Sequence, residues 1–173
     1  MHQLLLLRHA KSAWDDSSLA DRDRPLSKRG RRAIAAIRDA MRELDLGPDV
    51  VLVSPARRTR ETLEGLEPWD SMPLIEPIER LYLASSKDLL AVLHEVNETV
   101  RSLMLIGHNP GMHELAIELV RSRPSTDATA RLIASFPTAA LAEFSIAVPW
   151  ARLDTGGGQL IRYLTPRDLR EVD

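Results

Sequence analysis

The chain contains no cysteine, few aromatic residues and no strong excess of either charge. The absence of cysteine excludes disulfide bonds, metal sites with thiolate ligands and a cysteine nucleophile. A net charge of −2 argues against nucleic acid as a partner, because general binding to nucleic acid requires a basic surface. No apolar run is long enough for a membrane span or the core of a signal peptide, so we expect a cytoplasmic protein without a membrane partner.

Three short apolar runs are typical of buried parallel strands. The runs are Leu4–Leu7, Val50–Val53 and Leu103–Ile106. Apolar segments at 141–148 and 159–164 are expected to form two further strands, which would pair as an antiparallel hairpin at one edge of the sheet. Because no linker or repeat divides the chain, we expect one domain over residues 1–173. Its predicted fold class is α/β, a three-layer α/β/α arrangement with a mainly parallel central sheet.

Capping residues and apolar stripes predict the helices. Ser27 precedes an apolar stripe that ends before Gly47-Pro48. Ser54-Pro55 and Asn109-Pro110 each combine a capping side chain with a proline typical of a first helical turn, so we expect helices to begin there. Shorter elements are expected as a strand around Leu74-Ile75, a helix capped by Ser85 or Ser86, and a helix between Pro124 and Ala134.

Each of the three buried runs leads to residues that suit a phosphoryl group. Arg8-His9 follows the first run, Arg58 lies shortly after the second, and His108 follows the third. Since the carboxyl ends of parallel strands meet at one edge of a sheet, where ligands bind, we expect His9, Arg8, Arg58 and His108 to share one site. Arginine can hold phosphate oxygens with two hydrogen bonds.

His9 is the best candidate for a nucleophile that accepts the phosphoryl group. The chain offers no cysteine, and we find neither a convincing serine elbow nor a phosphate-binding loop of the P-loop type. The positive charge of the adjacent Arg8 disfavours the imidazolium form of His9 and so favours the nucleophilic, neutral form.

These motifs together resemble those of the histidine phosphatase (phosphoglycerate mutase-like) superfamily. Arg8-His9-Ala10 resembles its Arg-His-Gly signature, and Gly107-His108 is similar to its second histidine. The segment from Ser54 to Thr62 is similar to its Ser-x-x-x-Arg-Ala-x-Gln-Thr segment at Ser54, Arg58 and Thr62. The short length, Arg24-Pro25-Leu26-Ser27 and Leu81-Tyr82-Leu83-Ala84 resemble the SixA-type branch, the phosphohistidine phosphatases.

The resemblance implies hydrolysis in two steps, with neither a metal nor another cofactor. His9 would attack phosphorus to give a phosphohistidine intermediate, which water would then hydrolyse. Arg8, Arg58 and His108 would bind the phosphoryl oxygens, with His108 protonated. The chain departs from the family pattern at three positions, where Ala10 replaces Gly, Thr59 replaces Ala and Glu61 replaces Gln.

The region after Leu81 bears on the substrate. Mutases and alkyl-phosphate phosphatases of the superfamily have a carboxylate there as proton donor, whereas this chain has Tyr82-Leu83. An alkoxide leaving group usually needs a general acid, while the imidazole of phosphohistidine leaves more readily. We therefore expect removal of phosphate from phosphohistidine on a protein, such as a histidine phosphotransfer domain. Carboxylates that could donate a proton from elsewhere are Asp21, Asp23, Glu76 and Glu79.

Two alternative functions stay open. The first is a phosphatase for small phosphorylated metabolites, which uses the same chemistry on a different substrate. The second is a non-catalytic module that binds phosphorylated partners. Binding alone would not require a nucleophile at His9, so the motifs favour an enzyme. The sequence determines neither the physiological substrate nor the oligomeric state.

Overall fold

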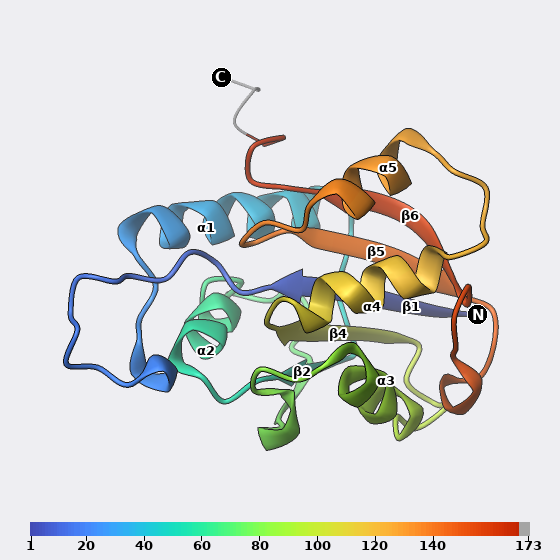
Figure 1. The fold of residues 1–173 in the computed structure, drawn as a ribbon, viewed down its shortest axis with the longest axis horizontal. Coiled ribbons are helices and arrows are strands. Elements are labelled where there is room, and N and C mark those ends of the chain that lie inside the picture. Colours follow the sequence, from blue (N-terminus) through green and yellow to red (C-terminus); the bar gives the residue numbers. More distant parts are fainter. Residues whose placement is uncertain (170–173) are drawn as a thin grey trace.

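The computed structural model describes residues 1–169 as a six-stranded sheet covered by helices on both faces (Figure 1). The strands are β1 (His2–Arg8), β2 (Val50–Val53), β3 (Leu74–Pro77), β4 (Ser102–Gly107), β5 (Leu141–Ile146) and β6 (Gly158–Leu164). Their order in the sheet is β3-β2-β4-β1-β5-β6. The first four pair in parallel, and β5 and β6 add an antiparallel hairpin at the edge. The predicted fold class is thus confirmed, while the last residues of the expected domain 1–173 lie outside the described residues.

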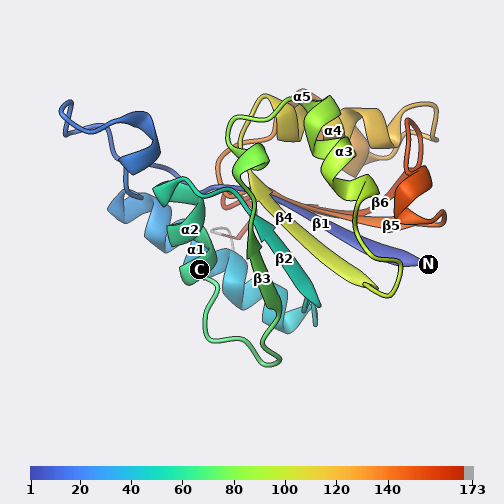
Figure 2. The same cartoon turned by 90° about the horizontal axis from the view of Figure 1, so that it is seen from below.

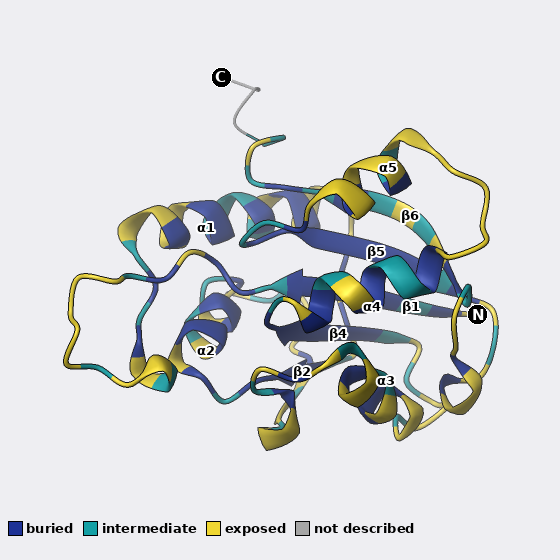
Figure 3. Cartoon of the chain, in the orientation of Figure 1, coloured by how far each residue is buried: buried dark blue, intermediate teal, exposed yellow. Residues whose placement is uncertain are grey.

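The helices form one layer on each face of the sheet (Figure 2). They are α1 (Lys28–Glu43), α2 (Arg57–Glu64), α3 (Ser86–His94), α4 (Gly111–Val120) and α5 (Asp127–Ala134). Side chains alternate along a strand, so Leu4 and Leu6 pack under α3 and α4 while Leu5 and Leu7 pack under α1. Both faces of β1 are therefore buried, which explains its unbroken apolar run (Figure 3).

None of the helices within residues 1–169 is long and apolar enough to cross a membrane. The cytoplasmic location and the exclusion of nucleic acid, both expected from composition, stay predictions.

Two of the predicted helix starts differ from the structure. Ser27 caps α1 as predicted, because its Oγ accepts a hydrogen bond from the backbone N–H of Gly30 at 3.0 Å. A helix beginning at Ser54 is wrong, since α2 begins at Arg57 and the Ser54 hydroxyl bonds the ring of His108 instead. The helix after Asn109 begins at Gly111, with the Asn109 side chain accepting from the backbone N–H of His113 at 3.3 Å.

The long connection between β1 and α1 is tied to the rest of the fold. Ser12 and Leu26 form an isolated antiparallel bridge, and the backbone N–H of Ala13 donates to the carbonyl of Pro25 at 2.8 Å. Between the two bridged segments the chain forms an exposed loop, which ends in a short 3₁₀ helix, Asp21–Asp23, next to α2 (Figures 1 and 3). The connection therefore carries Asp21 back to the carboxyl end of the sheet.

Candidate active site

The two predicted histidines lie together at the carboxyl ends of neighbouring strands. β1 and β4 pair so that Arg8 is opposite Gly107, which places His9 and His108 in equivalent positions after the two strands. The backbone N–H of His9 donates to the carbonyl of Gly107 at 3.1 Å, and the two imidazole rings have their centroids 5.4 Å apart. Both rings are almost completely buried, with 8% of His9 and 2% of His108 exposed.

The hydrogen bond of His9 selects the tautomer that a nucleophile requires. Its Nδ1 lies 2.7 Å from the carbonyl oxygen of Ala10. A carbonyl can only accept, so Nδ1 carries the proton, and the lone pair of the neutral ring stays on Nε2. Burial, opposed by this bond and assisted by the charges of nearby Arg58 and Arg8, lowers the pKa of His9 to about 4. His9 is therefore neutral at physiological pH.

His108 is neutral as well. Its Nε2 lies 2.8 Å from the hydroxyl of Ser54, while its buried Nδ1 has no hydrogen-bond partner among the described residues. Burial, followed by the proximity of His9 and Arg58, lowers the pKa of His108 to about 3. Without a bound anion His108 is therefore neutral, because the ring lies among cationic neighbours and out of water. Its protonation when it binds a phosphoryl group stays a prediction.

Arg8 is held by a backbone carbonyl from a distant part of the chain. Its guanidinium donates to the carbonyl of Phe136 at 3.1 Å, and the Asn109 side-chain amide donates to the same oxygen at 2.9 Å. Burial, together with the charge of Arg58, lowers the pKa of Arg8. The buried Nε of Arg8 has no acceptor among residues 1–169. Arg8 thus retains a buried donor that can bind an anion.

Arg58, only 4% exposed, is positioned by Asp21. Its guanidinium donates to the Asp21 carbonyl at 2.8 Å and to the carboxylate Oδ2 at 3.0 Å. The same Oδ2 accepts a short hydrogen bond from the hydroxyl of Tyr82. Tyr82 also packs edge-on against His108, with the ring centroids 5.5 Å apart. Asp21 and Tyr82 thus connect Arg58 to His108.

Of the four carboxylates considered as proton donors, the structure brings only Asp21 to the site. Glu79 pairs with Arg22 at 2.6 Å, and Glu76 is exposed on the edge strand β3. Asp23 is exposed at the end of the 3₁₀ helix. Hydrogen bonding from Tyr82, aided by Arg58, lowers the pKa of Asp21 despite partial burial, so this carboxyl is ionised at neutral pH. It is therefore poorly suited to donate a proton.

Sequence reasoning missed several residues that position the site. The Thr62 hydroxyl accepts from the backbone N–H of Ala10 at 3.0 Å and donates to the carbonyl of Arg58 at 2.7 Å, so it links the two halves of the site. Arg24 is buried, and its charge contributes to the low pKa of His9. Ser54 and Thr62 belong to the motif from Ser54 to Thr62, which could have identified them as positioning residues. No local sequence pattern predicts the pairing of Asp21 with Arg58.

The chemistry of this arrangement suits an anion attacked by a nitrogen nucleophile. A neutral imidazole with its lone pair on Nε2 lies among three arginines, and two buried nitrogens, Arg8 Nε and His108 Nδ1, lack partners within the described residues. A tetrahedral oxyanion would supply an acceptor for Arg8 Nε, and one for His108 Nδ1 in the tautomer whose Nε2 accepts from the Ser54 hydroxyl. Within residues 1–169 no group of three His, Cys, Asp or Glu side chains is placed to hold a metal ion. Metal independence stays a prediction.

Comparison with known proteins finds a matching family model, a curated relative and similar solved structures. The model of the histidine phosphatase superfamily (branch 1) matches residues 4–80. An uncharacterized protein of Mycobacterium tuberculosis is 35% identical over 165 residues, which are 93% of this chain and 100% of that protein. The solved structure of a putative phosphohistidine phosphatase SixA from Nakamurella multipartitia is 30% identical, with a TM-score of 0.84 over 95% of this chain and 96% of that chain. A second such structure, from Agrobacterium tumefaciens, is 31% identical, with a TM-score of 0.81 over 95% and 98% of the two chains.

Proposed function

The chain belongs to the histidine phosphatase superfamily and is a phosphatase, and on this basis we propose that it removes phosphate from phosphohistidine on a protein. His9 is the proposed nucleophile, and Arg8, Arg58 and His108 are the proposed ligands of the phosphoryl oxygens. The similar structures from Nakamurella and Agrobacterium carry the name of putative phosphohistidine phosphatases, which supports the proposed substrate class.

The observation that carries the proposal is the fixed tautomer of His9 beside two unpartnered buried nitrogens. Because the Ala10 carbonyl holds the Nδ1 proton, only Nε2 can attack. Arg8 Nε and His108 Nδ1 are each buried without a partner within residues 1–169, at a cost of about 1–3 kcal/mol apiece. A bound oxyanion would accept from Arg8 Nε, and from His108 Nδ1 in the tautomer whose Nε2 accepts from the Ser54 hydroxyl. A phosphoryl group that contacts Arg8 and His108 would lie among the arginines, whose positive charge would stabilise the transition state of its transfer.

The proposed reaction proceeds in two displacements at phosphorus. First, His9 Nε2 forms a bond to phosphorus while the P–N bond of the substrate breaks, and the departing imidazole takes up a proton from solvent. Second, water attacks the phosphorus of phosphorylated His9, the His9–phosphorus bond breaks, and inorganic phosphate leaves. His9 returns to its neutral form with Nδ1 still bonded to Ala10.

The state of Asp21 favours a P–N bond over an ester. Hydrolysis of an alkyl ester requires protonation of an alkoxide, which a neutral carboxylic acid usually provides. Asp21 is ionised and receives hydrogen bonds from Tyr82, Arg58 and Arg24, so it holds no proton to give. Imidazole is a better leaving group than an alkoxide and needs less assistance from a general acid. This supports phosphohistidine over the small phosphate esters that form the second candidate substrate class.

The test compares a protein phosphorylated on histidine with a panel of small phosphate esters, in the presence of a metal chelator. We expect turnover of the phosphohistidine protein and a trapped label on His9 that is labile in acid and stable in alkali. His9→Ala should lose both, whereas His94→Gln, at a histidine that bonds the Leu153 carbonyl far from the site, should keep both.

Other outcomes separate the alternatives. Turnover of the esters alone would reject phosphohistidine as the substrate and favour a metabolite phosphatase. Binding of phosphorylated protein without any release of phosphate would indicate a non-catalytic module. Undiminished activity of His9→Ala would refute the assignment of the nucleophile.

A further inference from the structure

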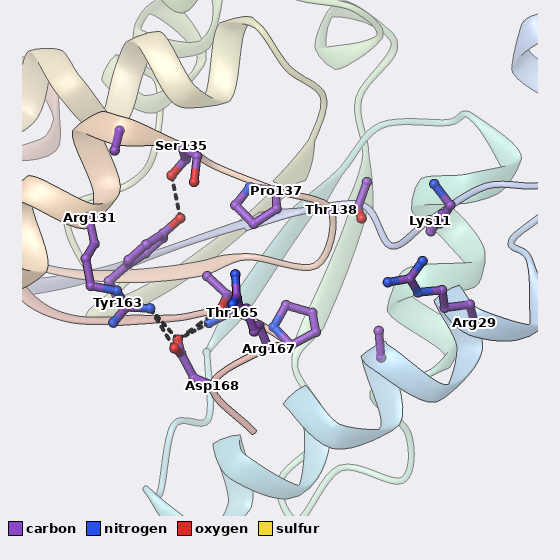
Figure 4. Close-up of a pocket in the computed structure, with 13 residues that line it drawn as sticks. Lys11, Arg29, Arg131, Ser135, Pro137, Thr138, Tyr163, Thr165, Arg167 and Asp168 are labelled. Carbon is purple, nitrogen blue, oxygen red and sulfur yellow. Dashed lines mark hydrogen bonds and ion pairs between the residues drawn. The ribbon is translucent and has the colours of Figure 1, made fainter. Parts of the chain in front are cut away.

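A cleft of about 750 Å³ outside the proposed catalytic site is lined by several cationic side chains (Figure 4). Lys11 and Arg29 come from one end of the cleft, at the segment after β1 and the start of α1. Arg131, from α5, and Tyr163, from β6, come from the other end, with Arg167 following β6. Ser135, Pro137 and Thr138 form part of the wall. None of these residues has a place in the proposed phosphoryl transfer.

The cleft begins next to the nucleophile. Lys11 is two residues from His9, and Thr138 precedes Ala139, whose backbone N–H donates to the carbonyl of His9 at 3.0 Å. Two residues of extended chain span about 7 Å at most, so the backbone that lines the cleft at Lys11 lies within about 7 Å of the backbone of His9. The backbone of Lys11 is fixed, because the N–H of Ser27 donates to its carbonyl at 2.9 Å.

Charge in the cleft is strongly unbalanced. Among residues 1–169, four cationic side chains line it against a single carboxylate, Asp168. That carboxylate is already used, since Arg131 binds its two oxygens at 2.7 and 2.6 Å and the backbone N–H of Thr165 donates to it at 2.8 Å. Within residues 1–169, Lys11, Arg29 and Arg167 form no ion pair. The cleft therefore attracts anions.

Exposure favours a protein surface over a small buried anion. The side chains of Lys11, Arg29, Arg131 and Arg167 are all exposed, so they can stay hydrated while they interact with the surface of a partner protein. Tyr163 offers no free donor, because its hydroxyl bonds the carbonyl of Ser135 at 2.6 Å. Solvated charges of this kind are typical of the rim of a transient protein interface, where they accelerate and orient encounter.

We infer that this cleft binds acidic residues that flank the phosphorylated histidine on the substrate protein. The inference rests on the proposed function, since it assigns part of the substrate to a second surface next to His9. Carboxylates of the partner would face Lys11, Arg29 and Arg167 while the phosphoryl group lies among the arginines of the catalytic site. The cleft would then select the protein substrate without taking part in the chemistry.

The test uses two peptides that each contain one phosphohistidine, flanked by glutamates in the first and by glutamines in the second. For the wild-type protein we expect a KM about five- to tenfold lower for the glutamate peptide, with equal kcat and with the difference lost at high salt. The double variant Arg29→Ala/Arg167→Ala should remove the preference. Arg101→Ala/Arg152→Ala, which deletes the same charge from exposed positions outside the cleft, should keep it.

A binding measurement separates failure of this inference from failure of the proposed function. Fluorescence anisotropy follows a labelled, unphosphorylated glutamate peptide, which should bind the wild-type protein more tightly than the cleft double variant. If neither phosphopeptide is hydrolysed but this difference in binding is seen, the proposed function fails and the cleft assignment stands. If both phosphopeptides are hydrolysed with equal KM and the peptide binds both proteins alike, the cleft assignment is overturned and the function stands.

Discussion

Replacing Thr62 with valine tests the link between the two halves of the site. Thr62 is fully buried, and its hydroxyl is the acceptor for the buried N–H of Ala10 at 3.0 Å. Valine has nearly the same shape but cannot accept a hydrogen bond, so the Ala10 N–H is left unpaired. An unpaired buried donor costs about 1–3 kcal/mol. Since about 1 kcal/mol corresponds to roughly 2–4 °C in Tm for a chain of this size, we expect Tm to fall by about 2–12 °C.

The same substitution should lower the rate. The carbonyl of Ala10 fixes the His9 tautomer, and an unanchored Ala10 lets the ring leave the geometry of attack. We expect kcat toward free phosphohistidine to fall by about tenfold, because small misplacements of a nucleophile are costly. The assays are thermal unfolding and steady-state release of phosphate, with both proteins measured in the same buffer.

Thr129→Val is the matched control for Thr62→Val. The Thr129 hydroxyl also accepts a backbone N–H, that of Thr126 at 2.6 Å, but it does so at the start of α5. This control should lose less stability, because Thr126 is exposed and its freed N–H can bond water, and it should keep its kcat. The reasoning is refuted if Thr62→Val keeps both the wild-type Tm and kcat, or if Thr129→Val lowers kcat as much as Thr62→Val does.

Three further predictions concern the effect of pH on stability, the pairing of Asp21 with Arg58 and the packing of α1. Because the pKa of His9 falls from an unfolded value near 6.5 to about 4, the unfolded chain binds more protons between these values. His9 should therefore contribute a drop in the free energy of unfolding of up to about 1.4 kcal/mol per pH unit as pH falls from 6.5 to 4, and urea titrations of His9→Ala should show a drop that is shallower by this amount. Asp21→Asn should lower kcat/KM by about tenfold, because Arg58 loses the carboxylate that positions it. Asp23→Asn, at an exposed position two residues away, should leave kcat/KM unchanged. Equal kcat/KM values for the two variants would contradict the role of Asp21. Gly30→Ala places a Cβ 2.2 Å from a backbone carbonyl oxygen and should cost about 1–3 kcal/mol in chemical unfolding, whereas Gly47→Ala meets nothing within 4 Å and should stay close to wild type.

The structure also shows how neutral histidines persist among arginines. Three arginines lie near His9, and each disfavours a proton on its ring. Of these, Arg58 and Arg24 are paired with Asp21, so their charge is partly balanced. The site therefore attracts an anion without protonating the nucleophile that must attack it.

Local sequence patterns were reliable where a single segment decided the outcome. The buried runs became β1, β2 and β4 with boundaries close to those predicted, because strands buried on both faces need apolar side chains at every position. The antiparallel hairpin of β5 and β6 was predicted from the same kind of pattern. The predicted helix start at Ser54 was wrong because a side chain that can cap a helix can also form a hydrogen bond with a residue from another strand. The hydroxyl of Ser54 bonds the ring of His108, which follows β4.

Local patterns in the chain are enough to identify the buried strands and to place Arg8, His9 and His108 at the ends of two of them, and parallel strands end at a common edge. The contacts that hold these groups in place come from packing between distant segments. The contacts of Asp21 with Arg58, of Thr62 with Ala10 and of Ser54 with His108 join residues 37, 52 and 54 positions apart. Such contacts depend on how the loop after β1 and helix α2 pack across the sheet, and no local preference of the chain specifies that packing.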